Sequence, residues 1–87
     1  MDATAAYRSA TDAPRDRPHE LLDARDLAPP GPLQRTLETL PRLDDDVVLV
    51  QLNDRVPQLL FAKLDDRGYR YDTAEVDDGV VTAIWRP

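Results

Sequence analysis

The spacing of apolar residues along the chain predicts two short helices. In residues 33–42, leucines recur at i, i+4 and i+7, which places them on one face of a helix. Pro32 fits the first turn of this helix, where a missing N–H costs nothing, and Pro41 ends it. A second helix is expected over residues 55–67. Its apolar face would consist of Val56, Leu59, Leu60 and Leu64.

Two runs of apolar residues predict strands on either side of the first helix. Residues 47–52 read VVLVQL, and a run that is apolar on both faces indicates a central strand buried on both sides. Residues 20–24 predict an earlier strand. Its adjacent Leu21 and Leu22 place this strand, too, near the middle of the sheet.

The last part of the chain predicts a β-hairpin. Residues 69–76 alternate in polarity, and residues 80–86 are apolar on both faces. Between them, Asp77–Asp78–Gly79 has the composition of a tight turn. The element order is therefore β-α-β-α-β-β.

This order predicts an α/β (α+β) fold. Strands joined through a helix pair in parallel, a hairpin pairs antiparallel, and two helices can cover one face of a four-stranded sheet. We therefore predict a two-layer sandwich, a four-stranded mixed sheet with two helices on one face. The other face would stay partly open, with Val81 and Trp85 either forming a homodimer surface or closing the edge of the core.

Residues 1–17 show no periodic apolar pattern. They are mostly small and polar, so we expect a disordered N-terminal tail. Residues 18–87 would form one domain, since a chain of 87 residues has room for no more.

The charge composition bears on the solvent. The chain carries 17 acidic and 11 basic residues, for a net charge of −6. Fourteen of the acids are Asp, and Lys63 is the single lysine. A negative surface keeps molecules apart, and concentrated salt screens its self-repulsion. We interpret the chain as a halophilic acidic protein of the archaeal type, in which most acidic clusters are solvated surface.

The residues present exclude several kinds of chemistry. With no cysteine, the chain has no disulfide, no thiolate metal ligand and no thiol nucleophile. His19, the one histidine, cannot make a metal site alone, and no serine or threonine lies in a His–Asp arrangement. We expect no catalytic residue, metal or cofactor. No segment is long enough to span a bilayer and no secretory signal is visible, so we expect a cytoplasmic protein without a membrane partner.

The carboxyl ends of the two parallel strands are the place to search for a binding site. Both strands end at the same edge of the sheet, each loop leads to a helix N-terminus, and open α/β sheets bind ligands at that edge. Two helix N-termini and two arginines there would hold an anion or a partner's carboxylate. The candidate binding residues are Arg25, Asp26, Pro29, Pro30, Asn53, Asp54 and Arg55.

The same residues have a purely structural interpretation. Arg25 and Asp26 would brace the loop, and Asn53 or Asp54 would cap the second helix. Both interpretations stay open, because a residue at this edge can serve both.

A resemblance to the TusA/SirA-like family is visible in two stretches, LDARDLAPPGP at Leu22–Pro32 and LVQLND at Leu49–Asp54. In that family a first strand runs into Leu-Asp-x-Arg, and a Cys-Pro-x-Pro motif opens the first helix. In its paired prolines and its Asn-Asp, the chain is still more similar to an uncharacterised sister family, the domain of unknown function numbered twenty-two forty-nine. The resemblance covers residues 19–87 and implies the same sandwich fold.

The chain departs from the sulfur-carrier pattern at Pro29. Such carriers hold a persulfide on a cysteine just before the first proline of the loop, and persulfide transfer needs a thiolate. Pro29 stands at the aligned position. The resemblance therefore implies the scaffold, and the missing sulfur excludes sulfur transfer.

The sequence supports three hypotheses about function. The first is a non-catalytic protein-interaction or accessory module on a sulfur-carrier-like scaffold, with an unidentified protein partner. The second is a small anionic ligand binder or enzyme at the helix N-termini. The third, a nucleic-acid-binding module, is disfavoured by the net charge of −6, because phosphate neutralisation dominates such binding. It would need an arginine stripe on one face, drawn from among Arg42, Arg67, Arg70 and Arg86.

Overall fold

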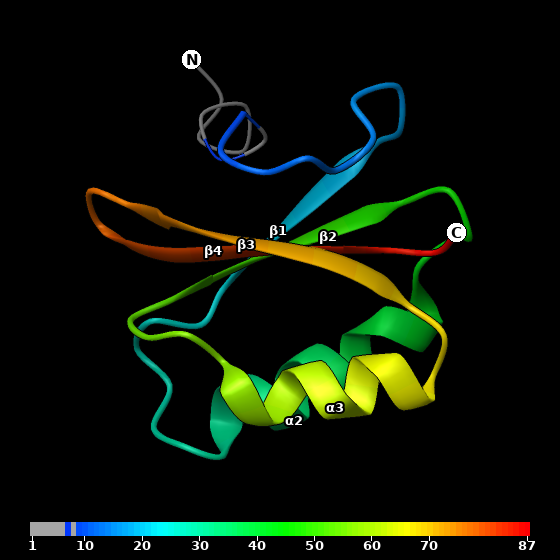
Figure 1. The fold of residues 1–87 in the computed structure, drawn as a ribbon. Coiled ribbons are helices and arrows are strands. Elements are labelled where there is room, and N and C mark those ends of the chain that lie inside the picture. The colour runs from blue at the N-terminus through cyan, green and yellow to red at the C-terminus, as the bar shows by residue number, and fades with distance from the viewer. Residues whose placement is uncertain (1–6, 8) are drawn as a thin grey trace.

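A four-stranded mixed sheet and two helices make up the fold in the computed structural model, which describes Tyr7 and residues 9–87. The strands lie in the order β1-β2-β4-β3, and both helices lie under one face of the sheet (Figure 1). The elements are β1 (His19–Asp23), α2 (Gly31–Thr39), the 3-10 turn η1 (Leu40–Arg42), β2 (Val48–Asn53), α3 (Gln58–Asp66), β3 (Arg70–Val76) and β4 (Gly79–Trp85).

The predicted two-layer sandwich is confirmed. β1 and β2 pair in parallel, and β4 pairs antiparallel with both β2 and β3. β2 is central as predicted, and all six of its residues are buried. β1 was expected near the middle, which is wrong: it is an edge strand, because β4 occupies the other side of β2. Leu21 and Leu22 of β1 are half-buried, one on each face.

One of two hydrophobic cores lies between the sheet and the helices. Its buried members are Leu40, Leu49, Leu60, Leu64 and Ile84. Leu33 and Leu37 of α2 pack against this cluster with their predicted face. Phe61 of α3 stacks on Tyr71 of β3, with ring centroids 4.9 Å apart. In the described part of the chain, no helix is long and apolar enough to cross a bilayer.

The first helix is longer at its start than predicted. α2 begins at Gly31, with Pro32 in its first turn as expected. At Leu40 the chain tightens into η1, which contains Pro41. Because proline has no N–H to continue the α-helical ladder, the α-helix ends before it.

The second helix starts later than predicted. Pro57 adopts a non-helical conformation, with φ −83° and ψ 69°, and α3 begins only at Gln58. We placed Val56 and Leu59 on the buried face of this helix, which is wrong. These two residues are 39% and 78% exposed. Val56 precedes the first residue of α3, and Leu59 lies in the first turn of α3 but outside its buried face, which Leu60 and Leu64 form.

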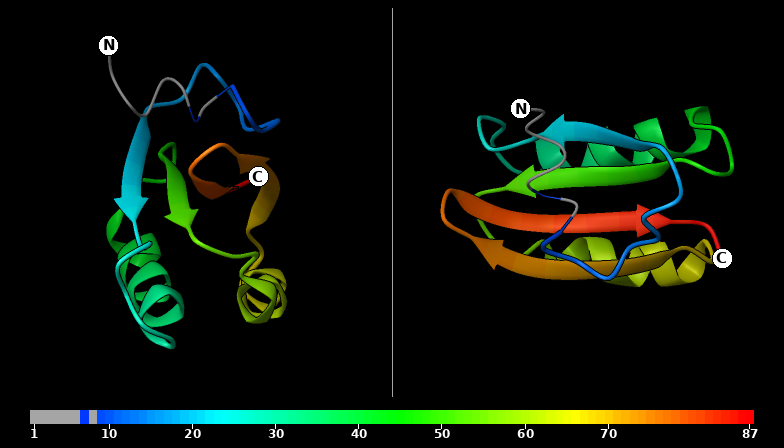
Figure 2. Two further views of the ribbon diagram at one scale, coloured as in Figure 1. Left: turned by 90° about the vertical axis from the view of Figure 1, so that its left-hand side faces the viewer. Right: turned by 90° about the horizontal axis from the view of Figure 1, so that it is seen from above.

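The face of the sheet opposite the helices is covered by the N-terminal segment, defined here as Tyr7 and residues 9–17. This segment, which we expected to be disordered, runs across the strands (Figure 2). Thr11 and Ala13 are each 3% exposed, because their small side chains fit flat against the sheet. Ala13 belongs to a second buried cluster with Val48, Val50, Leu52, Val81 and Ala83. The remaining residues of the expected tail, 1–6 and 8, lie outside the described residues.

Hydrogen bonds tie the N-terminal segment to the C-terminal hairpin and the residue that follows it. They run from Tyr7 Oη to Asp78 Oδ2 (2.8 Å), from the Asp12 N–H to Asp72 Oδ2 (2.8 Å), and from Arg17 Nη1 to the Arg86 carbonyl (2.6 Å). The sheet face is therefore not open where we expected it to be. Val81 is fully buried, and Trp85 is half-buried against the same cluster.

Gly79 allows the hairpin to approach the end of β2. A Cβ at this position would collide with the carbonyl oxygen of Asn53, so no other residue fits without a shift of the backbone. Gly68, with φ +77°, follows α3 in the left-handed conformation that ends many helices. The contact at Gly79 helps to place Asn53, which belongs to the candidate site described next.

Candidate functional site

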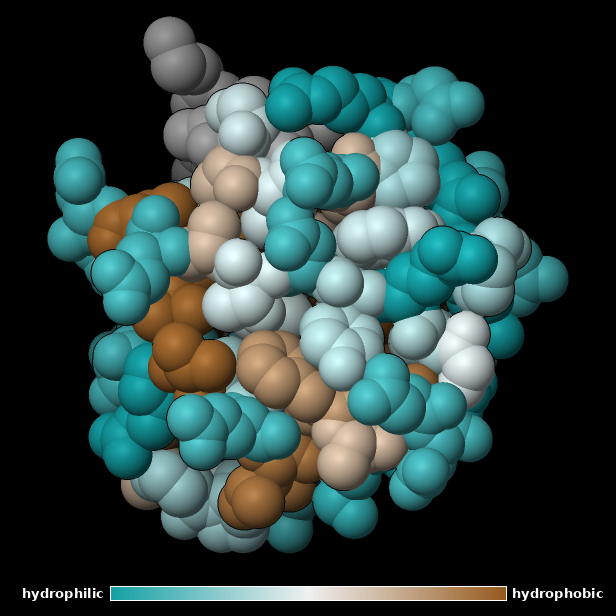
Figure 3. Space-filling model, viewed as in Figure 1, coloured by the Kyte–Doolittle hydropathy of each residue, from teal (hydrophilic) through white to brown (hydrophobic). Residues whose placement is uncertain are grey.

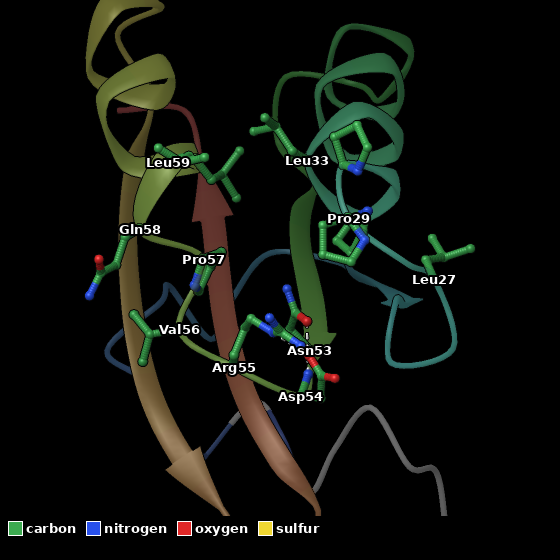
Figure 4. A pocket seen from close by; sticks show the side chains of 13 residues that line it. Leu27, Pro29, Leu33, Asn53, Asp54, Arg55, Val56, Pro57, Gln58 and Leu59 are labelled. Atoms are coloured by element: carbon green, nitrogen blue, oxygen red, sulfur yellow. Dashed lines mark hydrogen bonds and ion pairs between the residues drawn. The ribbon is translucent and has the colours of Figure 1, made fainter.

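A cavity of about 300 Å³ opens between the first turns of α2 and α3, where β2 ends (Figure 4). The loops that follow β1 and β2 form its walls, so it lies at the edge where the two parallel strands end. Nine of its thirteen lining residues are Leu, Pro or Val, among them Leu27, Leu33, Val56, Leu59 and Leu60. The cavity is therefore an apolar pocket with a small polar end.

Four prolines shape the walls of this pocket. Pro29, Pro30 and Pro32 surround the start of α2, and Pro57 directly precedes α3. The peptide bond between Pro29 and Pro30 is cis. Since proline has no N–H, these positions present apolar rings where a phosphate-binding loop would present amide donors.

The polar end of the pocket is built on Asn53, the last residue of β2. Its side chain is nearly buried, with the residue only 3% exposed. Asn53 Oδ1 accepts a hydrogen bond from the Asp54 N–H at 2.8 Å, and its Nδ2 lies 3.5 Å from Gln51 Oε1. In Figure 4 the amide nitrogen points toward the space between the helices. Asn53 was predicted to bind or to cap α3; neither it nor Asp54 makes a side-chain cap.

Asp54 and Arg55 form an ion pair at the mouth of the pocket. Arg55 Nε donates to Asp54 Oδ1 at 3.1 Å, and the side chains are 66% and 53% exposed. The hydrogen bond from Arg55 lowers the pKa of the Asp54 carboxyl below its ordinary value. An exposed pair of this kind contributes little to stability, so both groups remain available to a ligand.

The structure brings five of the seven predicted site residues together. Pro29, Pro30, Asn53, Asp54 and Arg55 all line the pocket. They lie together because the parallel pairing of β1 and β2 places both loops at one edge.

Arg25 and Asp26 do not line the pocket. Arg25 instead braces the loop, as the structural interpretation supposed: its Nη2 lies 2.7 Å from Asp23 Oδ2, and its Nη1 lies 3.3 Å from Asp78 Oδ2. Hydrogen bonding from Arg25 lowers the pKa of the Asp23 carboxyl. Tyr7 donates to the same Asp78 carboxylate, so Arg25 links β1, the hairpin turn and the N-terminal segment.

The apolar walls were missed by sequence reasoning. Val56 and Leu59 follow the helical period and were assigned to the core for that reason, but both line the pocket. Val56 is left there because α3 begins only after Pro57, and Leu59 because it lies in the first turn of α3, outside the buried face. Pro57 was the available signal for Val56, since the residue before a proline is disfavoured in helical conformation.

The lining offers little for catalysis. Its ionisable residues are Asp54 and Arg55, which pair with each other. The lining residues include no Ser, Thr, Cys, His, Lys or Tyr, and their one carboxylate, Asp54, has no second base beside it. Within Tyr7 and residues 9–87, no group of three His, Asp or Glu side chains is placed to hold a metal ion. The arrangement is suited to binding.

Fold and cavity together define a small α+β domain with an apolar pocket at the ends of its parallel strands. The chain belongs to the family described as "Uncharacterized conserved protein (DUF2249)", whose model matches residues 21–86. The match includes both loops of the pocket. No curated protein and no solved structure matches the chain.

Proposed function

We propose that this chain is a non-catalytic protein-interaction module whose contact surface is the apolar pocket between α2 and α3. The observation that carries the proposal is the exposure of apolar side chains at the pocket, where Leu59 is 78% and Val56 39% exposed. Hydrophobic surface is visible below the sheet, beside the helices (Figure 3). Exposed apolar groups around a concave site are typical of a surface that a partner covers.

A small-ligand binder is the second candidate, and the concave shape of the pocket favours it. The volume of about 300 Å³ lies at the lower end of the range for small-molecule sites. A ligand held inside the pocket would leave Leu59 in water, whereas a protein surface would cover it. For this reason the interaction module ranks first.

The scaffold and its environment complete the proposal. We propose that the fold is related to the TusA/SirA-like sulfur carriers, with Pro29 where those carriers hold their cysteine. The loop that enters α2 supports this relation, since it keeps the Leu-Asp-x-Arg and proline pattern. The excess of Asp over Glu and the single lysine support a halophilic acidic protein that works in a cytoplasm of high salt.

The test is affinity capture of the tagged chain from lysate of its source cells at molar salt, with bound proteins identified by mass spectrometry. We expect one stoichiometric partner with the natural chain, and loss of that partner with Leu59→Ser. Because Leu59 is largely exposed, this change should leave the fold intact.

Arg70→Glu is the matched control, because Arg70 is exposed on β3, away from the pocket. It should retain the partner. A partner that binds Leu59→Ser as well as the natural chain would place the contact elsewhere and contradict the proposal.

A further inference from the structure

The polar end of the pocket gathers hydrogen-bond donors. The Asn53 amide carries two N–H bonds, and its one acceptor within the described residues, Gln51 Oε1, is 3.5 Å away. Arg55 uses Nε for Asp54, and its two terminal nitrogens have no partner among the described residues. A buried amide donor and a free guanidinium edge therefore face the same cavity from the end of β2.

The two helices add positive potential to this end. α2 and α3 are nine residues long, and both begin at the pocket. A helix N-terminus carries a partial positive charge, which an acidic residue in the first turn would offset. The first turns of α2 and α3 contain no acidic residue and no side-chain cap. Asp54 is the one carboxylate among the lining residues, and Arg55 already pairs with it.

Donors at one end and apolar walls around the rest define the ligand. We propose that the pocket binds the C-terminal residue of a partner protein, with an apolar side chain between Leu33 and Leu60 and the terminal carboxylate at Asn53 and Arg55. This inference rests on the proposed function and names the part of the partner that is recognised. Capture of a C-terminal carboxylate by convergent donors is an established mode of peptide recognition.

Size and charge favour a chain terminus over an internal segment. An engineered cavity of about 150 Å³ holds a benzene molecule, so about 300 Å³ has room for one large apolar side chain and a carboxylate. An internal peptide segment has an uncharged main chain and would offer only carbonyl oxygens to the two terminal nitrogens of Arg55, which the ion pair with Asp54 does not use. A free small acid would fill the pocket but leave Leu59 exposed.

The experiment is a ¹⁵N–¹H NMR titration of the full chain at molar salt with three probes: N-acetyl-leucine, its neutral carboxamide, and hexanoate. We expect N-acetyl-leucine to shift the Asn53 side-chain amide and the backbone amides of Leu33 and Leu60. It should bind at least about ten times more tightly than the carboxamide, a difference of about 1.4 kcal/mol. Hexanoate, which lacks the peptide group, should bind more weakly than N-acetyl-leucine.

Two variants locate the carboxylate. Arg55→Gln, at a residue that is two-thirds exposed, should fold normally and lose the preference for the acid. Asn53→Asp should lose it as well, because it replaces the amide donor by a like charge. Arg70→Gln is the matched control and should keep the full preference. If Asn53→Asp does not fold, Arg55→Gln decides alone.

Three outcomes would overturn the inference. If N-acetyl-leucine and its carboxamide bind equally, the pocket binds apolar groups and does not recognise a carboxylate. The proposed interaction surface is not contradicted by that result. If hexanoate binds as tightly as N-acetyl-leucine, the ligand of the pocket is a free small acid and not the end of a protein chain. Chemical-shift changes outside the pocket, or no changes with any probe, would show that the pocket does not bind a terminal carboxylate. The affinity capture with Leu59→Ser would then test the proposed function separately.

Discussion

Gln51 Nε2 of the central strand donates a hydrogen bond of 2.7 Å to Thr36 Oγ1 of α2, and both residues are fully buried. This bond crosses the core between the sheet and the first helix. Because Gln51 Oε1 faces the Asn53 amide, the same side chain connects α2 with the polar end of the pocket. The buried polar residues of β2 therefore position the candidate site.

The first prediction concerns this bond. Thr36→Val keeps the shape of the side chain but leaves Gln51 Nε2 buried without an acceptor. We expect a loss of about 1–3 kcal/mol in the free energy of unfolding, measured by urea denaturation. Thr39→Val, which removes a hydroxyl bonded only to the Arg35 carbonyl near the surface, should cost less. Equal losses in the two variants would show that the bond to Gln51 adds nothing.

The N-terminal segment should be required for stability. Deletion of residues 1–17 exposes Val50, Val81 and their neighbours, and burial of one such side chain stabilises by about 1.5–3 kcal/mol. We expect a lower denaturation midpoint and concentration-dependent association by light scattering, since an apolar sheet face would meet water. Deletion of residues 1–6 keeps the described contacts and serves as control. A stable monomer after the longer deletion would contradict the role assigned to the segment.

Arg25 should stabilise the fold in a pH-dependent way. It lowers the pKa of Asp23 in the folded state, so its contribution is present above the ordinary value of 3.8 and is lost as the pH falls through the lowered pKa. The difference in unfolding midpoint between the natural chain and Arg25→Gln should therefore be largest near neutral pH and shrink in acid. Arg70→Gln, at a residue without an ion pair in the described part of the chain, should show no such trend. A difference that is constant with pH would exclude this linkage.

Gly68, which precedes the hairpin, and Gly79, which lies at its turn, should respond differently to a methyl group. Gly79→Ala forces a Cβ against the Asn53 carbonyl, and we expect a loss of about 3 kcal/mol. In Gly68→Ala the added methyl group has no neighbouring atom to collide with. The expected loss in stability is that of holding alanine in the left-handed conformation, about 1 kcal/mol. Thermal denaturation of both variants measures the difference, and the reverse order would contradict the close approach at Gly79.

The acidic composition should make stability depend on salt. With a net charge of −6, concentrated KCl should raise Tm by about 5 °C or more, which corresponds to about 1 kcal/mol for a domain of this size. A triple change of Asp44, Asp45 and Asp46 to Asn should flatten this dependence, because it removes one cluster of like charges. A Tm indifferent to salt would argue against the halophilic interpretation.

The fold was predictable where short-range patterns decide the structure. The run at 47–52 is apolar on both faces, and β2 is buried on both faces and central. The parallel pairing of β1 and β2 followed from the element order, and this pairing brings Pro29 and Asn53 to one pocket. The element order was therefore enough to predict that these two loops lie together.

What could not be predicted depends on contacts that are distant in sequence. Ala13 is buried by strands more than thirty residues away, and no local pattern marks it. Arg25 is held outside the pocket by Asp23, two positions before it, and by Asp78, 53 positions along the chain, and only the first of these contacts is local in sequence. Leu59 has the spacing of a residue on the core face of a helix but is exposed in the structure, so the periodicity assigned it to the wrong surface.

Similarity to the family begins at residue 21, yet Tyr7 and Ala13 already pack against the sheet. The unit that sequence comparison recognises is therefore smaller than the unit that folds. A fusion or a cleavage placed at the start of the similarity would separate the sheet from the covering of its second face. For this chain, the segment before β1 belongs to the folding unit.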